Sequence, residues 1–190
     1  MSTFQAIAVG PGFGTDLSAL TILKTLFENY RSPIVLDADA LTILPLHKEL
    51  LRCIPPGSIL TPHPGELKKL VGVWQSDIEK FDLVTGMASQ LNVILILKGY
   101  QTLIATPNGT YYVNTTGNQG MAKGGTGDVL TGVILGLLAQ GYSSEEASKI
   151  CVFLHSMAGD IAEKKFTVQG MTTSDLVDSL GSAWKELITK

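Results

Sequence analysis

Short apolar runs that alternate with helical patterns constrain the fold of this chain most. Four runs have the length and composition of buried strands, at residues 4–9, 33–36, 58–60 and 93–97. Between them, apolar residues recur at helical spacing from a cap at Thr15 or Asp16 to Tyr30, and over 66–71 and 75–91. Continuously apolar strands joined by helices are typical of a parallel sheet covered on both faces. We therefore predict an α/β fold.

The second half of the chain departs from this alternation. Residues 102–105 and 110–113 flank Pro107-Asn108-Gly109, which is a strong signal for a β-hairpin. Helical patterns then cover 127–140, 144–165 and 172–188. We find no repeat, linker or low-complexity tract, so the sequence predicts one domain over residues 1–190, with a mostly parallel sheet and an added hairpin.

Composition excludes several classes of partner. The chain has 190 residues, 45% of them hydrophobic, and a net charge of −3. These values fit a globular protein and give no reason to expect nucleic acid or an anionic membrane as partner. We expect Cys53 and Cys151 to be buried thiols in a reducing compartment. No signal peptide or spanning segment is recognisable, so we expect a cytoplasmic protein.

A glycine-rich loop at residues 120–128 carries the strongest chemical signal. It has four glycines and ends at Asp128, where a helical pattern begins. Glycine lets such a loop turn its backbone N–H groups toward one anion, and the following helix adds the positive end of its dipole. Asp128 could then accept a proton beside a bound phosphate, or it could only cap the helix. No Lys-Ser or Lys-Thr follows the last glycine, so this is not a Walker P-loop.

Further polar residues follow the predicted strands directly, at 10–14, 37–39, 63–66 and 98–99. In open α/β sheets, ligands bind beyond the carboxyl ends of the strands. Structural alternatives exist for single positions. Asp39 could cap a helix near Ala40, Glu66 could favour a helix N-terminus, and Lys98 could be a solvated lysine. We expect His155 and Asp160 to be structural.

The order of these motifs resembles a known family. The segments AVGPGFGTD, VLDADAL, TPHPGE, LKGYQT and NQGMAKGGTGDVLTGVILGLLAQG resemble the ADP- or ATP-dependent NAD(P)H-hydrate dehydratases of the ribokinase-like superfamily. The resemblance implies a ribokinase-like three-layer α/β/α fold. It also implies a repair reaction, in which hydrated NADH or NADPH loses water while ADP or ATP is hydrolysed in the presence of Mg²⁺. Relatives commonly form homo-oligomers, in particular tetramers.

The resemblance assigns roles to residues that match its motifs. Asp128 is the implied catalytic base on the ring hydroxyl of the substrate. Gly12, Gly14, His63 and Glu66 are implied, with Asp128, to contact the hydrated substrate. No side chains are assigned as protein ligands of the metal. The implied nucleotide-binding residues are Lys98, Gly99, Tyr100, Gln101, Thr102, Asn118, Gly120, Met121, Ala122, Lys123, Gly124, Gly125, Thr126 and Gly127.

Members of this family carry further sequence before the strand that precedes Gly10, so we expect the chain to be N-terminally truncated, with an unpaired sheet edge. Three other functions remain open. The chain could bind nucleotide only as a scaffold, without catalysis. The order of strand, glycine turn at 10–14, helix, second strand and Asp37 also imitates a Rossmann dinucleotide-binding domain. A superfamily kinase for a hydroxyethylthiazole- or pyridoxal-type alcohol would share the glycine-rich loop and Asp128.

Overall fold

The computed structural model describes residues 5–189, in which six strands form one mixed sheet in the order β1-β2-β3-β4-β5-β6. The first four strands are parallel, and β5 and β6 form an antiparallel hairpin beside β4. The predicted α/β class and the hairpin are confirmed. Phe4, the predicted start of the first strand, lies outside the described residues. The strands are β1 (Ile7–Val9), β2 (Ile34–Leu36), β3 (Ile59–Leu60), β4 (Ile94–Leu97), β5 (Thr102–Ala105) and β6 (Tyr111–Asn114).

The helices agree with the predicted pattern within a few residues at most ends. Of the two predicted caps, Thr15 and Asp16, it is Asp16 that caps the first helix, through the N–H group of Ala19. The longest helix runs five residues beyond its predicted end and contains a break at Thr167. The helices are α1 (Leu17–Asn29), α2 (Ala38–Ile43), α3 (Pro64–Val71), α4 (Asp77–Leu91), α5 (Thr126–Ala139), α6 (Ser144–Gly170) and α7 (Thr173–Ile188), with short 3₁₀ turns at Leu44–Leu46, Lys48–Cys53 and Gln119–Met121.

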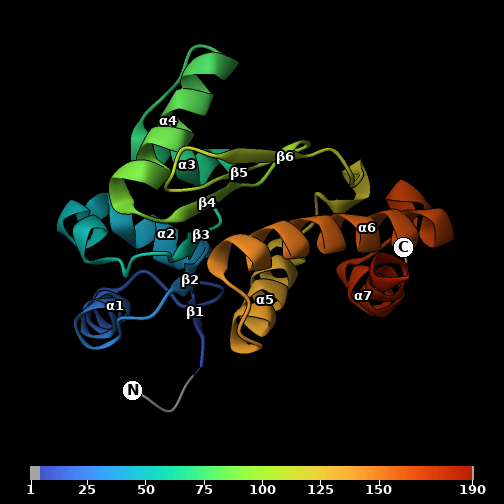
Figure 1. Cartoon of the computed structure of the whole chain (residues 1–190), viewed down its shortest axis with the longest axis horizontal. Coiled ribbons are helices and arrows are strands. Elements are labelled where there is room, and N and C mark those ends of the chain that lie inside the picture. Colours follow the sequence, from blue (N-terminus) through green and yellow to red (C-terminus); the bar gives the residue numbers. More distant parts are fainter. Residues whose placement is uncertain (1–4, 190) are drawn as a thin grey trace.

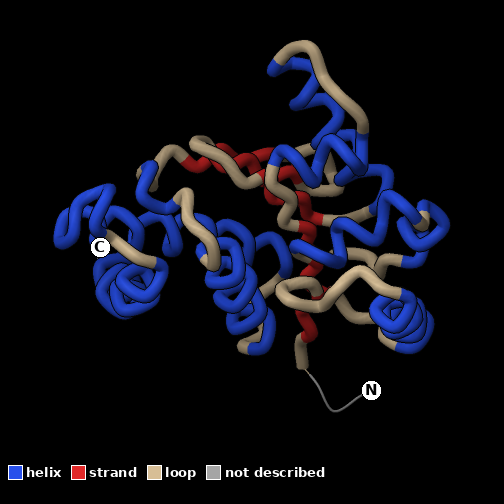
Figure 2. Tube along the Cα trace, turned by 180° about the vertical axis from the view of Figure 1, so that it is seen from behind, coloured by secondary structure: helices blue, strands red, loops and turns tan. Residues whose placement is uncertain are grey.

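The strand order explains which helices cover which face. Each of the first four strands adds to the same edge of the sheet. Crossovers between parallel strands are right-handed, so α1 to α4 must all lie on one face. Helices α5 and α6 cover the other face, and α7 packs against α6 (Figures 1 and 2). This sequential order also excludes the Rossmann alternative, whose strand order reverses in the middle of the sheet.

Alternation along the strands builds a core on each face. In β2, Ile34 and Leu36 pack among α1 to α4, whereas Val35 packs with α5 and α6. In β4, Leu95 and Leu97 face the first group, and Ile94 and Ile96 the second. Successive side chains of a strand point to opposite faces, so these strands are apolar throughout. The predicted three-layer arrangement is confirmed.

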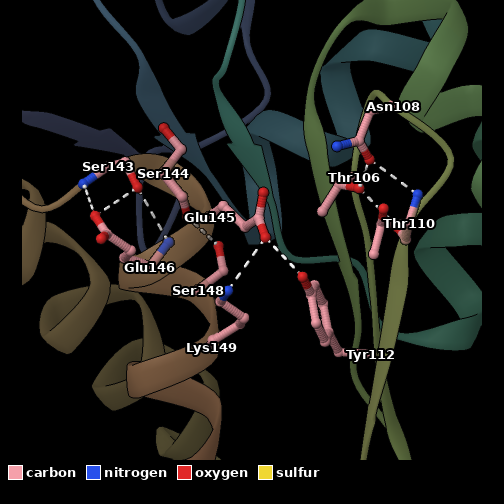
Figure 3. A network of polar contacts seen from close by, with 10 residues as sticks. All are labelled: Thr106, Asn108, Thr110, Tyr112, Ser143, Ser144, Glu145, Glu146, Ser148 and Lys149. Carbon is pink, nitrogen blue, oxygen red and sulfur yellow. Dashed lines mark hydrogen bonds and ion pairs between the residues drawn. The ribbon is translucent and has the colours of Figure 1, made fainter.

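The hairpin is fixed to α6 by a polar network near the start of β6 (Figure 3). The Tyr112 hydroxyl donates to Glu145 Oε1 at 2.7 Å, and Lys149 Nζ donates to the same oxygen at 3.1 Å. Lys149 also lies 4.8 Å from the centre of the Tyr112 ring. The hydrogen bond from Tyr112, followed by that from Lys149, lowers the pKa of Glu145. These contacts hold β6 of the hairpin against the first turns of α6.

Two predictions about single residues are wrong. Cys53 is exposed in the 3₁₀ turn after α2, whereas Cys151 is buried in α6 as expected, where burial raises the pKa of its thiol. Asp39 does not cap a helix near Ala40, because α2 begins at Ala38. Within the described residues, no helix has the length and apolar character needed to cross a membrane.

Candidate functional site

A cavity of about 640 Å³ opens beside the carboxyl ends of β3 and β4, at the N-terminus of α5. This volume lies within the range of roughly 300–1,000 Å³ that is typical of small-molecule sites. Its walls come from four parts of the chain that are distant in sequence. They are His63, Pro64, Lys98, Gly99, Tyr100, Thr102, Thr116, Gly117, Asn118, Gln119, Met121, Ala122, Lys123, Thr126, Gly127, Leu130, Val152, His155 and Ser156.

The glycine-rich loop supplies backbone donors beside this cavity, which Gly127 lines. The N–H groups of Gly124, Gly125, Gly127 and Asp128 donate to no other group among the described residues. Gly125 is the N-cap of α5 and has a left-handed backbone (φ 89°), which a residue with a side chain would adopt at a cost. Free donors at the positive end of a helix dipole are suited to binding an anion, and we call these four N–H groups the anion site. This is the geometry that the sequence predicts for a bound phosphate.

Asp128 lies in the first turn of α5 and is not the helix cap. Its side chain is exposed and stands outside the residues that line the cavity. Asp128 is nevertheless the next residue after Gly127, which does line the cavity, so its carboxylate belongs to a residue adjacent to the site. The capping interpretation of Asp128 is therefore wrong, and its carboxylate is free to meet a second ligand beside the first.

A buried ion pair lies beneath the anion site. Lys98 Nζ donates to Asp37 Oδ1 at 2.7 Å, and the Thr131 hydroxyl donates to Asp37 Oδ2 at 2.7 Å. Asp37 is 1% exposed and the Lys98 side chain 22% exposed. A Cβ at Gly127 would lie 3.3 Å from Lys98 Nζ, which places the ammonium directly under the start of α5. Lys98 is thus a positioned cation at the cavity wall, and the interpretation as a solvated lysine is wrong.

His63 and Glu66 form a capping box at the start of α3. His63 Nδ1 accepts from the N–H groups of Gly65 (2.9 Å) and Glu66 (3.3 Å), while Glu66 Oε2 accepts from the His63 N–H at 2.8 Å. Because Nδ1 accepts, Nε2 of the neutral ring carries the proton, and it lies 3.4 Å from Glu66 Oε1. His63 borders the cavity, whereas Glu66 is buried behind it. The helix-end role of Glu66 is confirmed.

The first glycine turn lies at the end of β1, outside the lining of the cavity. Gly12 (φ 64°) and Gly14 (φ 80°) are exposed, and a Cβ at either would meet no atom within 4 Å. The Gly14 N–H donates to Asp39 Oδ2 at 2.8 Å, so Asp39 fixes this turn instead of capping a helix. The turn offers open backbone to a ligand, but it does not line the cavity at which most nucleotide-binding candidates lie.

Helix α6 holds the segment that leads from β6 to the glycine-rich loop. Ser156 Oγ accepts from Asn114 Nδ2 at 2.9 Å. One turn later, Asp160 accepts from the Gly117 N–H (3.1 Å) and from Asn118 Nδ2 (3.0 Å). Asp160 therefore orders the wall of the cavity, which is more specific than the general structural role that we predict from sequence.

Comparison with known proteins identifies the family of this chain. A model of the family described as NAD(P)H-hydrate dehydratase matches residues 1–181. The chain belongs to the NAD(P)H-hydrate dehydratase family. A bifunctional NAD(P)H-hydrate repair enzyme of Moorella thermoacetica is 37% identical over 182 residues, which cover 95% of this chain and 34% of that protein. An ADP/ATP-dependent NAD(P)H-hydrate dehydratase from Bacillus subtilis, co-crystallised with ATP/Mg²⁺, superposes with a TM-score of 0.84 at 34% identity.

The family has the ribokinase-like α/β fold, which this chain shares. The Bacillus subtilis match covers 96% of this chain and 64% of that one. The chain thus spans between a third and two thirds of the length of these members of the dehydratase family. A hydroxyethylthiazole kinase from Pyrococcus horikoshii superposes with a TM-score of 0.73 at 16% identity, covering 93% of this chain and 70% of the kinase. That likeness shows the common fold alone.

Most residues that the family resemblance assigns to the nucleotide gather at the cavity. Ten of the fourteen line it, and those that do not are Gln101, Gly120, Gly124 and Gly125. Of the residues assigned to the dehydratase substrate, only His63 lines it. The assignment from sequence did not include eight other lining residues, which are Pro64, Thr116, Gly117, Gln119, Leu130, Val152, His155 and Ser156. The i, i+3, i+4 spacing of 152, 155 and 156 on α6 could have indicated a shared helix face.

His155 is a buried residue of α6 that also lines the cavity. It is 8% exposed, and its Nε2 lies 2.9 Å from the Thr126 carbonyl oxygen. A carbonyl only accepts, so the neutral ring carries its proton on Nε2. Burial lowers the pKa of His155, the nearby Lys98 charge acts in the same direction, and the hydrogen bond to Thr126 opposes them.

We expect this histidine to make stability depend on pH. The unfolded chain takes up the proton near pH 6.5 and the fold only at lower pH. Its contribution is therefore complete above about pH 6.5 and is lost as the pH falls from there through the lowered pKa. Urea unfolding between pH 7.5 and 5 should show a smaller decline for His155→Gln than for the unchanged chain. Parallel curves would contradict this assignment.

Proposed function

We propose that this chain removes water from hydrated NADH or NADPH and couples the reaction to hydrolysis of ADP or ATP. The observation that carries the proposal is the set of four free N–H groups, those of Gly124, Gly125, Gly127 and Asp128, beside a cavity of nucleotide size that Gly127 lines. Family membership supports the same reaction. The alcohol kinases share the fold, but no feature of the described residues favours their substrates.

The cavity supports placement of the adenine nucleotide. Apolar walls from Met121, Ala122, Leu130 and Val152 suit a flat base, and polar groups at one end suit phosphate. The terminal phosphate would lie on the free N–H groups, above the Lys98 ammonium. Lys98 then contributes a fixed positive charge where negative charge develops during phosphoryl transfer.

The hydrated substrate would lie on the far side of the anion site, between Asp128 and the glycine turn at Gly12 and Gly14. The Asp128 carboxylate takes the proton of the ring hydroxyl, and the hydroxyl oxygen attacks the terminal phosphorus as AMP or ADP leaves. The carbon–oxygen bond then breaks and its electron pair leaves with phosphate, while the neighbouring ring carbon loses a proton to water, so that the carbon–carbon double bond of the dihydropyridine is restored. A concerted loss of water would need the same residues.

We propose Mg²⁺ as the accompanying ion, held through nucleotide phosphates and water. Within residues 5–189, no three His, Cys, Asp or Glu side chains are placed to hold a metal. Mg²⁺ commonly binds through substrate phosphates and keeps several waters, which fits this donor set. When bound, it neutralises charge on the phosphoryl oxygens. A single domain, a cytoplasmic location and a homo-oligomer, in particular a tetramer, belong to the same proposal.

The test is recovery of reduced nicotinamide. The protein is mixed with hydrated NADH or NADPH, Mg²⁺ and either ADP or ATP, and absorbance of the dihydropyridine is followed. We expect recovery that requires the nucleotide. Phosphorylation of hydroxyethylthiazole or pyridoxal without any recovery would replace the proposal by the kinase alternative. Nucleotide binding without turnover of any of these substrates would leave a binding protein only.

A further inference from the structure

The ammonium of Lys123 is engaged away from the free N–H groups of its own loop. Lys123 is the one lysine within residues 120–128. Its Nζ donates to the carbonyl oxygens of Val168 (3.3 Å), Gln169 (3.4 Å) and, most closely, Met171. Carbonyl groups at the end of a helix carry partial negative charge and bind cations. A lysine next to an anion site is therefore occupied by the C-terminus of α6.

The junction between α6 and α7 is shaped to receive the loop. Thr167 breaks α6 with φ 64° and ψ 164°, a region that a β-branched residue occupies only when its surroundings hold it there. Past the junction, the Thr173 hydroxyl donates to the Gly124 carbonyl at 2.8 Å. A Cβ at Gly120 would lie 2.3 Å from Met171 Sδ, so the junction packs closely on the loop.

These contacts orient the free donors of the loop. The Thr126 hydroxyl donates to the carbonyl oxygen of Lys123 at 2.7 Å, and Thr173 engages that of Gly124. In a trans peptide the C=O and N–H groups point in opposite directions. Holding these two carbonyl groups toward Thr126 and Thr173 therefore turns the N–H groups of Gly124 and Gly125 the other way. Those are two of the four donors that remain free.

We propose that Lys123 is a positioning residue, which clamps the glycine-rich loop to the α6–α7 junction so that its N–H groups are preset for phosphate. The residue acts through the loop and does not bind the nucleotide with its charge. This inference rests on the proposed nucleotide site and names the device that organises it. Thr173 is the second contact of the same clamp.

The test compares Lys123→Met with Lys164→Met, which removes an equal charge from an exposed position of α6. Hydrogen exchange is measured first without nucleotide. We expect faster exchange in both 120–128 and 167–173 for Lys123→Met, and no change for Lys164→Met. ADP affinity, measured by calorimetry, should fall about tenfold to a hundredfold in Lys123→Met, because the loss of one hydrogen bond to a charged group typically has an effect of this order.

Unchanged exchange in the free protein with weaker ADP binding would overturn the proposal, because it would mean that the ammonium contacts phosphate directly. Unchanged exchange and unchanged affinity would also overturn it. Should Lys123→Met fail to fold, Thr173→Val removes only one hydroxyl and should raise exchange in the same two segments. If the unchanged protein binds no ADP, the proposed function fails, while the exchange measurement still decides whether the clamp exists.

Discussion

Asp128→Asn is expected to keep nucleotide binding and to lose the dehydration reaction. The amide has the shape of the carboxylate but cannot accept the hydroxyl proton. Loss of a positioned general base typically costs about a hundredfold to ten-thousandfold in rate. The side chain is exposed and lies outside the cavity lining, so the affinity for ADP should change little. Recovery of reduced nicotinamide and calorimetric ADP binding measure the two effects separately.

A matched control separates this effect from a general loss of charge. Asp178→Asn changes an exposed aspartate of α7 in the same way and should leave rate and affinity unchanged. Asp128 also lies near the positive end of the α5 dipole, so its amide variant should lose less than about 1 kcal/mol of stability. An Asp128→Asn protein that recovers reduced nicotinamide at the original rate would refute the assignment of the base.

Asp37→Leu is expected to have the largest effect on stability among the site residues. The substitution leaves the half-buried Lys98 ammonium and the buried Thr131 hydroxyl without their partner. Removing one member of a buried ion pair typically costs about 3–5 kcal/mol, and the partial exposure of Lys98 favours the lower end. Such a loss is a large share of the roughly 5–15 kcal/mol that stabilises a typical domain. Urea unfolding measures it.

A double-mutant cycle tests whether the pair is the cause. Adding Lys98→Met to Asp37→Leu removes the unpaired charge, so the double variant should be more stable than the sum of the two single changes predicts. Asp82→Leu, at an exposed position of α4, serves as the control and should lie within about 0.5 kcal/mol of the unchanged chain. Additive losses in the cycle would contradict a coupled pair.

Local sequence signals predicted the elements well. Asp16 caps α1, and Pro107-Asn108-Gly109 turns the hairpin with the Asn108 side chain accepting from the Thr110 N–H. Each of these signals acts within a few residues, so it is readable without tertiary contacts. The break at Thr167 was not readable, because a β-branched residue gives no local reason for a positive φ.

Only those parts of the site that depend on neighbouring residues could be predicted from the sequence. The glycine-rich loop and its N–H groups follow from residues adjacent in the chain. The partner of Lys98 lies 61 residues away at the end of β2, and the carbonyl groups that hold Lys123 lie 45 to 48 residues away. Whether such groups meet depends on strand register and helix packing. Exposure of Cys53 likewise depends on what packs over it.

Periodicity, glycine positions and apolar runs thus specified an α/β sheet with its polar residues at the carboxyl ends of the strands, since these properties repeat every two or 3.6 residues along the chain. The partners of the charged side chains, in contrast, depend on the tertiary structure. Lys98 meets Asp37 and Lys123 meets the carbonyl groups at the end of α6, because only strand register and helix packing bring these distant acceptors within reach of the two ammonium groups.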